Sequence, residues 1–313
     1  MQIVVAHHNP ASCERWREAL ARELPDVDVV VWNQGKSGDA RYAIAWAAPP
    51  QSFFAEHPHL KAFFSTGAGV EKILASPDLP ARLPIIRLED AGMAPQMARY
   101  CVSAALDWTG HHATYAEQQR TQTWRQLPSE DLADWPVGVF GLGVLGTEVA
   151  HSFAALGFTV NGFSRTKHAD ARIRSFAESD GAGSFESFLA ATRLLVILAP
   201  LTAATRDRFD HATLSRLRAG ACVVNVARGE LLVDDALLAL LDSGHLGGAA
   251  LDVFRQEPLP REHRFWTHPK IRLTPHISAI TVIGLSAQQV AQKVRRLERG
   301  EVVSGIVDRT RGY

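Results

Sequence analysis

The chain has 313 residues, of which 46% are hydrophobic and 21% are charged, a balance typical of a globular protein with large cores and room for two domains. Its 33 basic and 33 acidic residues cancel, so the charge favours neither a nucleic acid nor an anionic membrane as a partner. No apolar stretch approaches the length of a membrane span, and residues 1–6 run directly into a predicted strand without the pattern of a targeting signal.

The first hundred residues alternate between short apolar runs and helical patterns. Strands are predicted over residues 2–6, 27–32, 42–46, 60–65 and 85–88, and helices over 12–24 and 70–75. Alternation of this kind predicts a parallel sheet with helices on both faces. We therefore expect a first α/β domain, doubly wound and flavodoxin-like, over residues 1–97.

A second series of elements follows a long predicted helix over residues 94–116 and a polar loop or arm over 118–134. Its strands are predicted over residues 137–140, 159–163, 194–198, 222–226, 248–252 and 271–273. We expect this second domain to cover residues 98–282. The last helix, predicted over 279–299, is expected to pack back on the first domain with residues 283–313. The basic residues of that helix are expected to form a solvated face: Lys293, Arg295, Arg296 and Arg299.

The most informative segment is residues 136–166, PVGVFGLGVLGTEVAHSFAALGFTVNGFSRT. Gly141, Gly143 and Gly146 follow a predicted strand and open a predicted helix, which is the context that makes a G-x-G-x-x-G pattern meaningful. The glycines allow a tight turn, close approach of a pyrophosphate and close helix–strand packing. The backbone N–H groups of Val144 and Leu145, at the start of the helix, are placed to bind phosphate oxygens. The segment predicts a Rossmann domain.

The end of the same segment predicts which dinucleotide is preferred. An NAD-binding protein usually carries an acidic residue about 20 residues after the first glycine. Here Ser164, Arg165 and Thr166 stand at that position, 23 residues after Gly141, and no acidic residue lies between residues 163 and 168. Hydroxyl donors and positive charge favour a 2′-phosphate, so we expect NADP(H) over NAD(H). A solvated basic loop is the alternative interpretation.

Three ionisable residues each follow a different strand of the second domain. Arg228 follows strand 222–226, Glu257 lies in a proline-bounded loop after strand 248–252, and His276 follows strand 271–273. Ligands bind beyond the carboxyl ends of such strands. An arginine can bind a carboxylate through its planar fork, a histidine can protonate a developing alkoxide, and a neighbouring glutamate favours the imidazolium. Each residue alone is often structural; the three together predict an oxidoreductase site.

The segments GLGVLG, LAPLTAATRD, VNVARGE, AALDVFRQEPLP and TPHISA occur in this order, and in them the chain resembles the D-isomer-specific 2-hydroxyacid dehydrogenases. The resemblance implies that Arg228 binds the substrate carboxylate, His276 is the acid/base and Glu257 is its partner. It also implies that Asp252 contacts the nicotinamide carboxamide. Further cofactor contacts are implied for Pro200, Leu201, Thr205, Val226 and Ala227.

The resemblance extends into the first domain through AWAAPP, FFSTGAGVEKIL and RLEDAGMAPQMARY. It implies NADPH-dependent reduction of small 2-oxo acids, such as glyoxylate and hydroxypyruvate, to 2-hydroxy acids. The loop of Ala68, Gly69 and Val70 would present backbone N–H groups to the substrate carboxylate. Trp46 would close over the substrate, although core packing is an equal alternative for this side chain. A homodimer is also implied.

A regulatory protein that senses a dinucleotide, like the corepressors that share this fold, is the alternative function. The presence of Arg228, Glu257 and His276 together argues for the enzyme.

Cys13, Cys101 and Cys222 have no metal-ligand or redox spacing. We therefore expect reduced thiols in a cytoplasmic protein and no metal site.

Overall fold

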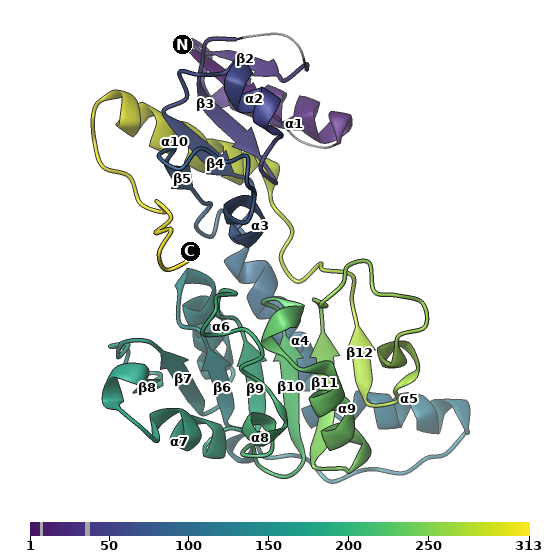
Figure 1. The fold of residues 1–313 in the computed structure, drawn as a ribbon. Helices are drawn as coiled ribbons and strands as arrows, with labels where there is room; N and C mark the ends of the chain where they lie inside the picture. The colour runs from purple at the N-terminus through teal and green to yellow at the C-terminus, as the bar shows by residue number, and fades with distance from the viewer. Residues whose placement is uncertain (7–8, 35–37) are drawn as a thin grey trace. The chain divides into compact units, whose positions relative to one another are not determined.

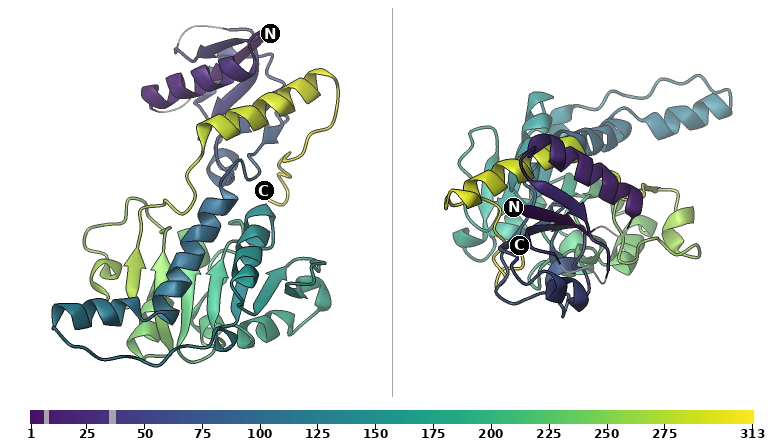
Figure 2. Two further views of the ribbon diagram at one scale, coloured as in Figure 1. Left: turned by 180° about the vertical axis from the view of Figure 1, so that it is seen from behind. Right: turned by 90° about the horizontal axis from the view of Figure 1, so that it is seen from above.

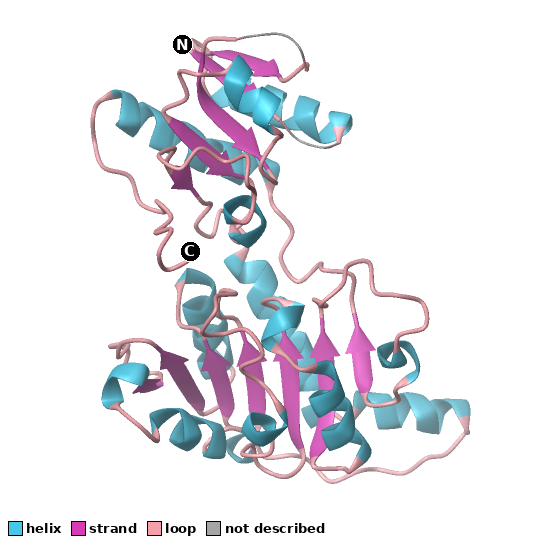
Figure 3. Ribbon diagram, in the orientation of Figure 1, coloured by secondary structure: helices cyan, strands magenta, loops and turns pink. Residues whose placement is uncertain are grey.

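The computed structural model describes residues 1–6, 9–34 and 38–313, and these divide into two units. Unit 1 comprises Met1–Met93 and Thr281–Tyr313, and unit 2 comprises Ala94–Ile280. Each unit contains one parallel β-sheet with helices packed against it (Figures 1 and 3). The expected class, two α/β domains, is confirmed. Among the described helices, none is both long enough and apolar enough to cross a membrane.

Unit 1 has the strand order β2-β1-β3-β4-β5, which is the flavodoxin-like order. The strands are β1 (Gln2–Val5), β2 (Asp28–Val31), β3 (Ala40–Ala45), β4 (Ala62–Ser65) and β5 (Ile85–Ile86). The helices are α1 (Pro10–Glu23), α2 (Gln51–Glu56), α3 (Glu71–Leu74) and α10 (Ile283–Glu298). Helices α1 and α10 lie side by side (Figure 2). Phe53 of α2 and Ile73 of α3 belong to a buried core with Val4 and Phe63 of the sheet.

One basic residue of α10 differs from its expected solvated position. The side chain of Lys293 is only 9% exposed. Its Nζ donates to Glu89 Oε2 at 2.9 Å, to the Ser304 carbonyl at 2.9 Å and to the Arg87 carbonyl at 3.2 Å. Burial by itself raises the pKa of Glu89, but hydrogen bonds from Ser304 and Lys293 outweigh it and lower that pKa below its usual value. The expectation was therefore wrong for Lys293, which joins α10 to two loops of unit 1.

Replacing Lys293 by Met should destabilise unit 1 by about 2 kcal/mol, because it leaves the partly buried carboxylate of Glu89, 24% exposed, without its ion pair. Native-state amide hydrogen exchange in β1 and β3 of the full chain measures this loss. Arg296→Met is the matched control on α10: Arg296 pairs with Glu301 at the surface, and its loss should be below about 1 kcal/mol. Equal losses for the two variants would contradict the structural role of Lys293.

The ion pair of Lys293 and Glu89 also predicts that the stability difference between wild type and Lys293→Met depends on pH. The pKa of Glu89 is lower in the folded state, so its stabilisation is present above the unfolded pKa of about 4.3 and is lost as the pH falls through the folded value. In Lys293→Met the carboxylate has lost its cation, so less stability remains to be lost on acidification. The difference between wild type and Lys293→Met should therefore shrink as the pH falls below about 4.

Unit 2 has the strand order β12-β11-β10-β9-β6-β7-β8, with every pair parallel. The strands are β6 (Val137–Phe140), β7 (Val160–Ser164), β8 (Arg174–Ala177), β9 (Leu194–Ile197), β10 (Ala221–Asn225), β11 (Leu246–Leu251) and β12 (Ile271–Leu273). The helices are α4 (Ala94–Thr109), α5 (His112–Arg120), α6 (Val144–Ala155), α7 (Ser184–Ala190), α8 (His211–Leu214) and α9 (Asp234–Asp242). The order reverses between β6 and β9, the position at which doubly wound sheets bind their ligands.

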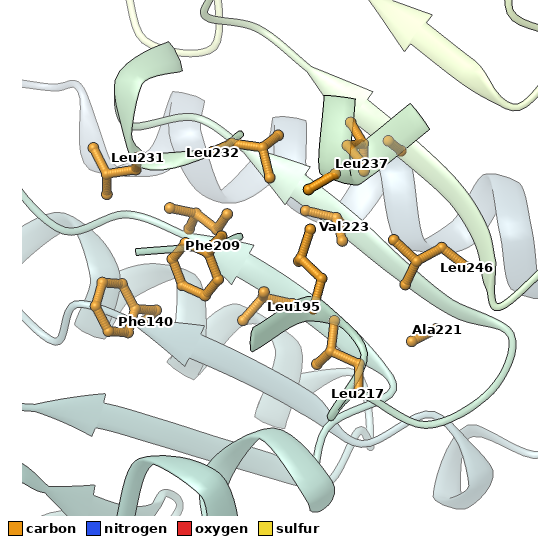
Figure 4. Packing of buried hydrophobic residues seen from close by; sticks show 14 of the residues in the cluster. Phe140, Leu195, Phe209, Leu217, Ala221, Val223, Leu231, Leu232, Leu237 and Leu246 are labelled. Atoms are coloured by element: carbon orange, nitrogen blue, oxygen red, sulfur yellow. The ribbon is translucent and has the colours of Figure 1, made fainter. Parts of the chain in front are cut away.

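Two buried cores cover the two faces of this sheet. Helices α7, α8 and α9 pack on one face, where Phe140, Leu195 and Val223 meet Phe209 and Leu237 (Figure 4). Helices α4 and α6 pack on the other face (Figure 2). Because both faces are covered, most of these strands are nearly continuous runs of apolar residues, which is why six of the seven could be predicted. The edge strand β8 has the sequence RSFA, with Arg174 exposed, and was missed because it lacks an apolar run.

The helix predicted over residues 94–116 is in fact two helices. It is interrupted at Gly110 and His111, and His111 has a φ of 52° in the left-handed region. A left-handed residue cannot continue a right-handed helix, so α4 ends at Thr109 and α5 begins at His112. Helix α10 begins at Ile283 rather than 279, because Asp252 and Gln96 hold residues 277–280 as a loop through hydrogen bonds to their backbone N–H groups.

Candidate active site

The glycine turn lies between β6 and α6, as predicted. Gly141 has a φ of 108°, and a Cβ there would lie 2.7 Å from the backbone nitrogen of Ala199. A Cβ on Gly146 would lie 1.8 Å from the carbonyl oxygen of Gly141, so α6 can approach β6 only with glycine at this position. A Cβ on Gly143 would meet no protein atom within 4 Å. The turn is therefore closely packed at Gly141 and Gly146 and open at Gly143. This arrangement leaves room for a pyrophosphate at the start of α6.

The chain at the end of β7 is held by its own hydrogen bonds. Ser164, the last residue of β7, donates its hydroxyl to the Thr166 carbonyl at 2.7 Å, and the Arg165 carbonyl accepts from the Ser179 N–H at 3.1 Å. The side chains of Arg165 and Thr166 are exposed. Lys167 pairs with Asp180 at 3.3 Å. The loop thus presents a hydroxyl and a guanidinium to solvent, directly after the strand end.

Arg228 stands on a turn that Asn225 organises. The fully buried side chain of Asn225 donates to the Arg228 carbonyl at 2.9 Å and accepts from the Ala227 N–H at 3.1 Å. The next residue, Gly229, packs so closely that a Cβ would lie 2.0 Å from the carbonyl carbon of Phe254. The turn with Arg228 therefore lies directly against the start of the loop that carries Glu257.

His276 and Glu257 form a hydrogen-bonded pair. His276 Nδ1 lies 2.8 Å from Glu257 Oε2, and Glu257 Oε1 accepts from the Phe254 N–H at 3.1 Å. An ionised carboxylate can only accept, so Nδ1 carries the hydrogen of this bond. The histidine side chain is 36% exposed and the glutamate side chain 29%. The pair can hold the imidazole in one orientation while Nε2 stays available to a reactant.

Asp252 is fully buried at the end of β11. Its Oδ1 accepts from the Thr274 hydroxyl at 2.6 Å and from the Ile277 N–H at 2.8 Å, and its Oδ2 accepts from the Ser278 N–H at 2.8 Å. The aspartate thus binds the chain on both sides of His276. Its implied contact with the nicotinamide carboxamide stays a prediction.

The remaining predicted cofactor residues follow two neighbouring strands. Pro200, Leu201 and Thr205 lie after β9, where the Thr205 hydroxyl donates to the Pro200 carbonyl at 2.7 Å. Val226 and Ala227 follow β10 and are buried. In a parallel sheet, the carboxyl ends of these strands, of β6 and of β7 lie along one edge. Among the described residues, no cluster of histidine, cysteine and carboxylate groups could hold a metal ion.

The residues predicted to bind substrate through the first domain belong to unit 1. Ala68, Gly69 and Val70 follow β4, and Ser65 orders the start of this loop, because its hydroxyl lies 3.1 Å from the Gly67 carbonyl. The Trp46 ring lies against Gly67, where a Cβ would be 3.0 Å from the ring. Trp46 is 43% exposed. This exposure argues against the core-packing alternative for Trp46.

Residues 102–278 match the D-isomer specific 2-hydroxyacid dehydrogenase, NAD binding domain. The chain belongs to this family. Over 99% of both chains, it is 38% identical to the glyoxylate/hydroxypyruvate reductase A of Photorhabdus laumondii and 40% identical to that of Citrobacter koseri. The expected enzyme class is confirmed: the chain is a 2-hydroxyacid dehydrogenase.

Two solved structures of this 2-hydroxyacid dehydrogenase family are similar over nearly the whole chain. One is the NADPH-dependent glyoxylate/hydroxypyruvate reductase of Sinorhizobium meliloti in complex with NADP and sulfate, 33% identical with a TM-score of 0.91 over 100% of this chain and 99% of that one. The other is the family member of Xanthobacter autotrophicus Py2 in complex with NADPH and MES. It is 36% identical, with a TM-score of 0.92 over 99% of both chains.

Sequence reasoning missed two polar residues of α4 that contact the histidine loop of the dehydrogenase. Tyr100 Oη lies 2.7 Å from Thr274 Oγ1, and Gln96 exchanges hydrogen bonds with the backbone of Ile280. A polar residue within a helical pattern carries no signal of its tertiary partner. Only the position of Thr274, two residues before His276, hinted that a polar contact would be needed there.

Proposed function

We propose that this dehydrogenase reduces small 2-oxo acids, such as glyoxylate and hydroxypyruvate, to 2-hydroxy acids with NADPH. The observation that carries the proposal is the 2.8 Å contact between His276 Nδ1 and Glu257 Oε2, beyond the strand ends of a dinucleotide-binding fold. The turn that bears Arg228 packs against the same glutamate loop. His276 and Arg228 thus lie on adjoining loops, which supports their proposed roles as the acid and the carboxylate-binding cation in the reduction of a 2-oxo acid.

His276 would act as the general acid of this reaction. Because Glu257 accepts from Nδ1, the Nε2 proton of the imidazolium is the one that passes to the keto oxygen. Arg228 would bind the substrate carboxylate through two parallel N–H···O bonds and polarise the adjacent carbonyl. When bound, the dinucleotide supplies the hydride that reduces the carbonyl carbon.

The cofactor would be held by the glycine turn and the loop after β7. The backbone of Gly141, Gly143, Val144 and Leu145 would bind the pyrophosphate. Ser164, Arg165 and Thr166 would bind a 2′-phosphate, since charge-assisted hydrogen bonds to this group contribute about 1.5–3 kcal/mol each. The NADP and NADPH in the two solved relatives support this assignment.

In unit 1, the backbone N–H groups of Ala68, Gly69 and Val70 would bind the substrate carboxylate, and Trp46 would limit the size of the substrate side chain. The half-exposed indole against Gly67 supports this role. A large aromatic ring beside a substrate excludes long side chains sterically. We therefore expect two- and three-carbon acids to react faster than branched ones.

We propose that the enzyme is a homodimer formed through unit 2. Helix α5 has no buried residue, and the side chain of Trp124 in the following arm is fully exposed. Exposed aromatic residues of this kind are enriched where proteins associate.

The three cysteines, Cys13, Cys101 and Cys222, are buried and unbridged. Free thiols support the proposal of a reducing, cytoplasmic location.

A turnover assay tests the proposed function. With NADPH, the purified enzyme should reduce glyoxylate and hydroxypyruvate, and kcat/KM with NADH should be about 10- to 100-fold lower, because NADH lacks the 2′-phosphate contacts. Branched 2-oxo acids test the predicted limit on the size of the substrate side chain, and they should react more slowly than the two- and three-carbon acids. Equal values for the two cofactors would contradict the cofactor assignment. Tight NADPH binding without turnover of any 2-oxo acid would instead favour a regulatory protein that senses a dinucleotide.

A further inference from the structure

Helix α4 holds the histidine loop, residues 274–280, at both ends. At the first end, Tyr100 Oη lies 2.7 Å from Thr274 Oγ1. At the other end, Gln96 Nε2 donates to the Ile280 carbonyl at 2.9 Å, and the Ile280 N–H donates back to Gln96 Oε1 at 3.2 Å. One rigid helix therefore contacts both ends of the segment that carries His276.

The direction of the hydrogen bonds at the first end is determined by chemistry. The Thr274 hydroxyl has one hydrogen and lies 2.6 Å from Oδ1 of Asp252. A carboxylate only accepts, so Thr274 donates to Asp252 and must accept from Tyr100. Burial raises the pKa of Tyr100 to about 12, which keeps the phenol protonated as a donor. The result is a one-way chain from Tyr100 through Thr274 to Asp252.

This chain of hydrogen bonds ends at Asp252, the residue that orients the histidine loop. Beyond Thr274, the Asp252 carboxylate accepts from the N–H groups of Ile277 and Ser278, and the Asp252 carbonyl accepts from the His276 N–H at 2.9 Å. His276 has a φ of 56°, in the left-handed region. Such a backbone is costly for a residue other than glycine and persists only where its surroundings impose it. Asp252 and its partners supply that restraint.

We propose that Tyr100 and Gln96 are positioning residues that hold the loop of His276 in its reactive geometry. The inference rests on the proposed function, in which His276 is the acid. Neither residue needs to touch the substrate. The charged groups around this loop are Glu257 on the imidazole, Asp252 on the backbone, and Arg272 on β12, which pairs with Asp107. None of these can replace the phenol of Tyr100 as a neutral donor to Thr274.

Tyr100→Phe tests the first contact, and Tyr115→Phe is the matched control. Tyr115 lies on α5, where its hydroxyl accepts from the Leu127 N–H, away from the histidine loop. Tyr100→Phe should lower kcat about tenfold while leaving the KM for NADPH within about twofold. Amide hydrogen exchange of the 274–280 peptide, measured by mass spectrometry, should accelerate about tenfold. Tyr115→Phe should change neither quantity.

A double-variant cycle tests whether Tyr100 acts through Thr274. Thr274→Val breaks the chain, so adding Tyr100→Phe to it should lower kcat by less than twofold, because residues that act in one network are not additive. Gln96→Leu removes the contact at the other end and provides a second variant if Tyr100→Phe does not fold. It should also accelerate exchange of the 274–280 peptide.

The exchange measurement separates this inference from the proposed function. If wild type reduces no 2-oxo acid, the proposed function fails, but the exchange rates still show whether α4 holds the loop. Equal exchange of the 274–280 peptide in wild type, Tyr100→Phe and Gln96→Leu would overturn the inference. An unchanged kcat in Tyr100→Phe, with normal turnover in wild type, would also overturn it.

Discussion

Replacing His276 by Gln should lower kcat by 10²- to 10⁴-fold, the usual contribution of a general acid. Glutamine can still donate a hydrogen bond to Glu257, but it has no titratable proton to give to the keto oxygen. The dissociation constant of NADPH should stay within about twofold, since the predicted cofactor contacts lie on other loops. Stopped-flow turnover and a fluorescence titration with NADPH measure the two quantities.

His112→Gln is the control for this substitution. His112 Nδ1 lies 2.9 Å from Asp107 Oδ1, so it forms the same kind of histidine–carboxylate pair at an exposed position on α5. Its replacement should leave kcat unchanged. A kcat within threefold of wild type in His276→Gln would remove His276 as the acid, and a parallel loss in His112→Gln would point to a general effect on stability.

Replacing Arg228 by Ala should lower kcat/KM by 10²- to 10⁴-fold, with a higher KM for the 2-oxo acid and a lower kcat. Two charge-assisted hydrogen bonds to the carboxylate would be lost, at about 1.5–3 kcal/mol each. Arg228→Lys should recover only part of the loss, because an ammonium keeps the charge but not the planar fork. Steady-state kinetics with glyoxylate measures all three values.

Two further measurements make the Arg228 prediction specific. With glyoxylamide, which has no carboxylate, wild type and Arg228→Ala should differ by much less than with glyoxylate. Arg264→Ala is the control, because Arg264 pairs with Asp242 at the surface, and it should keep wild-type kinetics. If Arg228→Ala loses as much activity on the amide as on the acid, Arg228 does not bind the carboxylate.

The two α/β domains were largely predictable, and candidate site residues could be proposed at their strand ends, because these signals are local. Gly141, Gly143 and Gly146 belong to one turn, and their spacing can be recognised within six residues of chain, although it is the backbone of Ala199 that leaves no room for a Cβ at Gly141. Arg228, Glu257 and His276 are far apart in sequence, but each follows a buried strand, and parallel strands bring such positions to one sheet edge. The predicted strands, each recognised from a few residues, therefore allowed us to predict that residues far apart in sequence lie at the same sheet edge.

Other features could not be predicted because they depend on partners distant in sequence. The sequence places Lys293 on an amphipathic helix, where a lysine is usually solvated. It is nevertheless buried, because the carboxylate of Glu89, 204 residues away, accepts a hydrogen bond from its ammonium group. The break between α4 and α5 at His111 was missed because a single glycine such as Gly110 is tolerated within a helix. In both cases the deciding interaction or backbone angle exists only in the folded chain.

The residue pattern alone was sufficient to predict two α/β domains and a glycine turn between a strand and a helix, since backbone preferences and apolar periodicity act over a few residues. It also placed the candidate residues Arg228, Glu257 and His276 after strand ends. Tertiary structure decided how His276 is held: Asp252 binds the chain on both sides of it, and Tyr100, 174 residues before Thr274, completes the support. Such hydrogen bonds depend on distances between side chains that only the packing of α4 on the sheet determines.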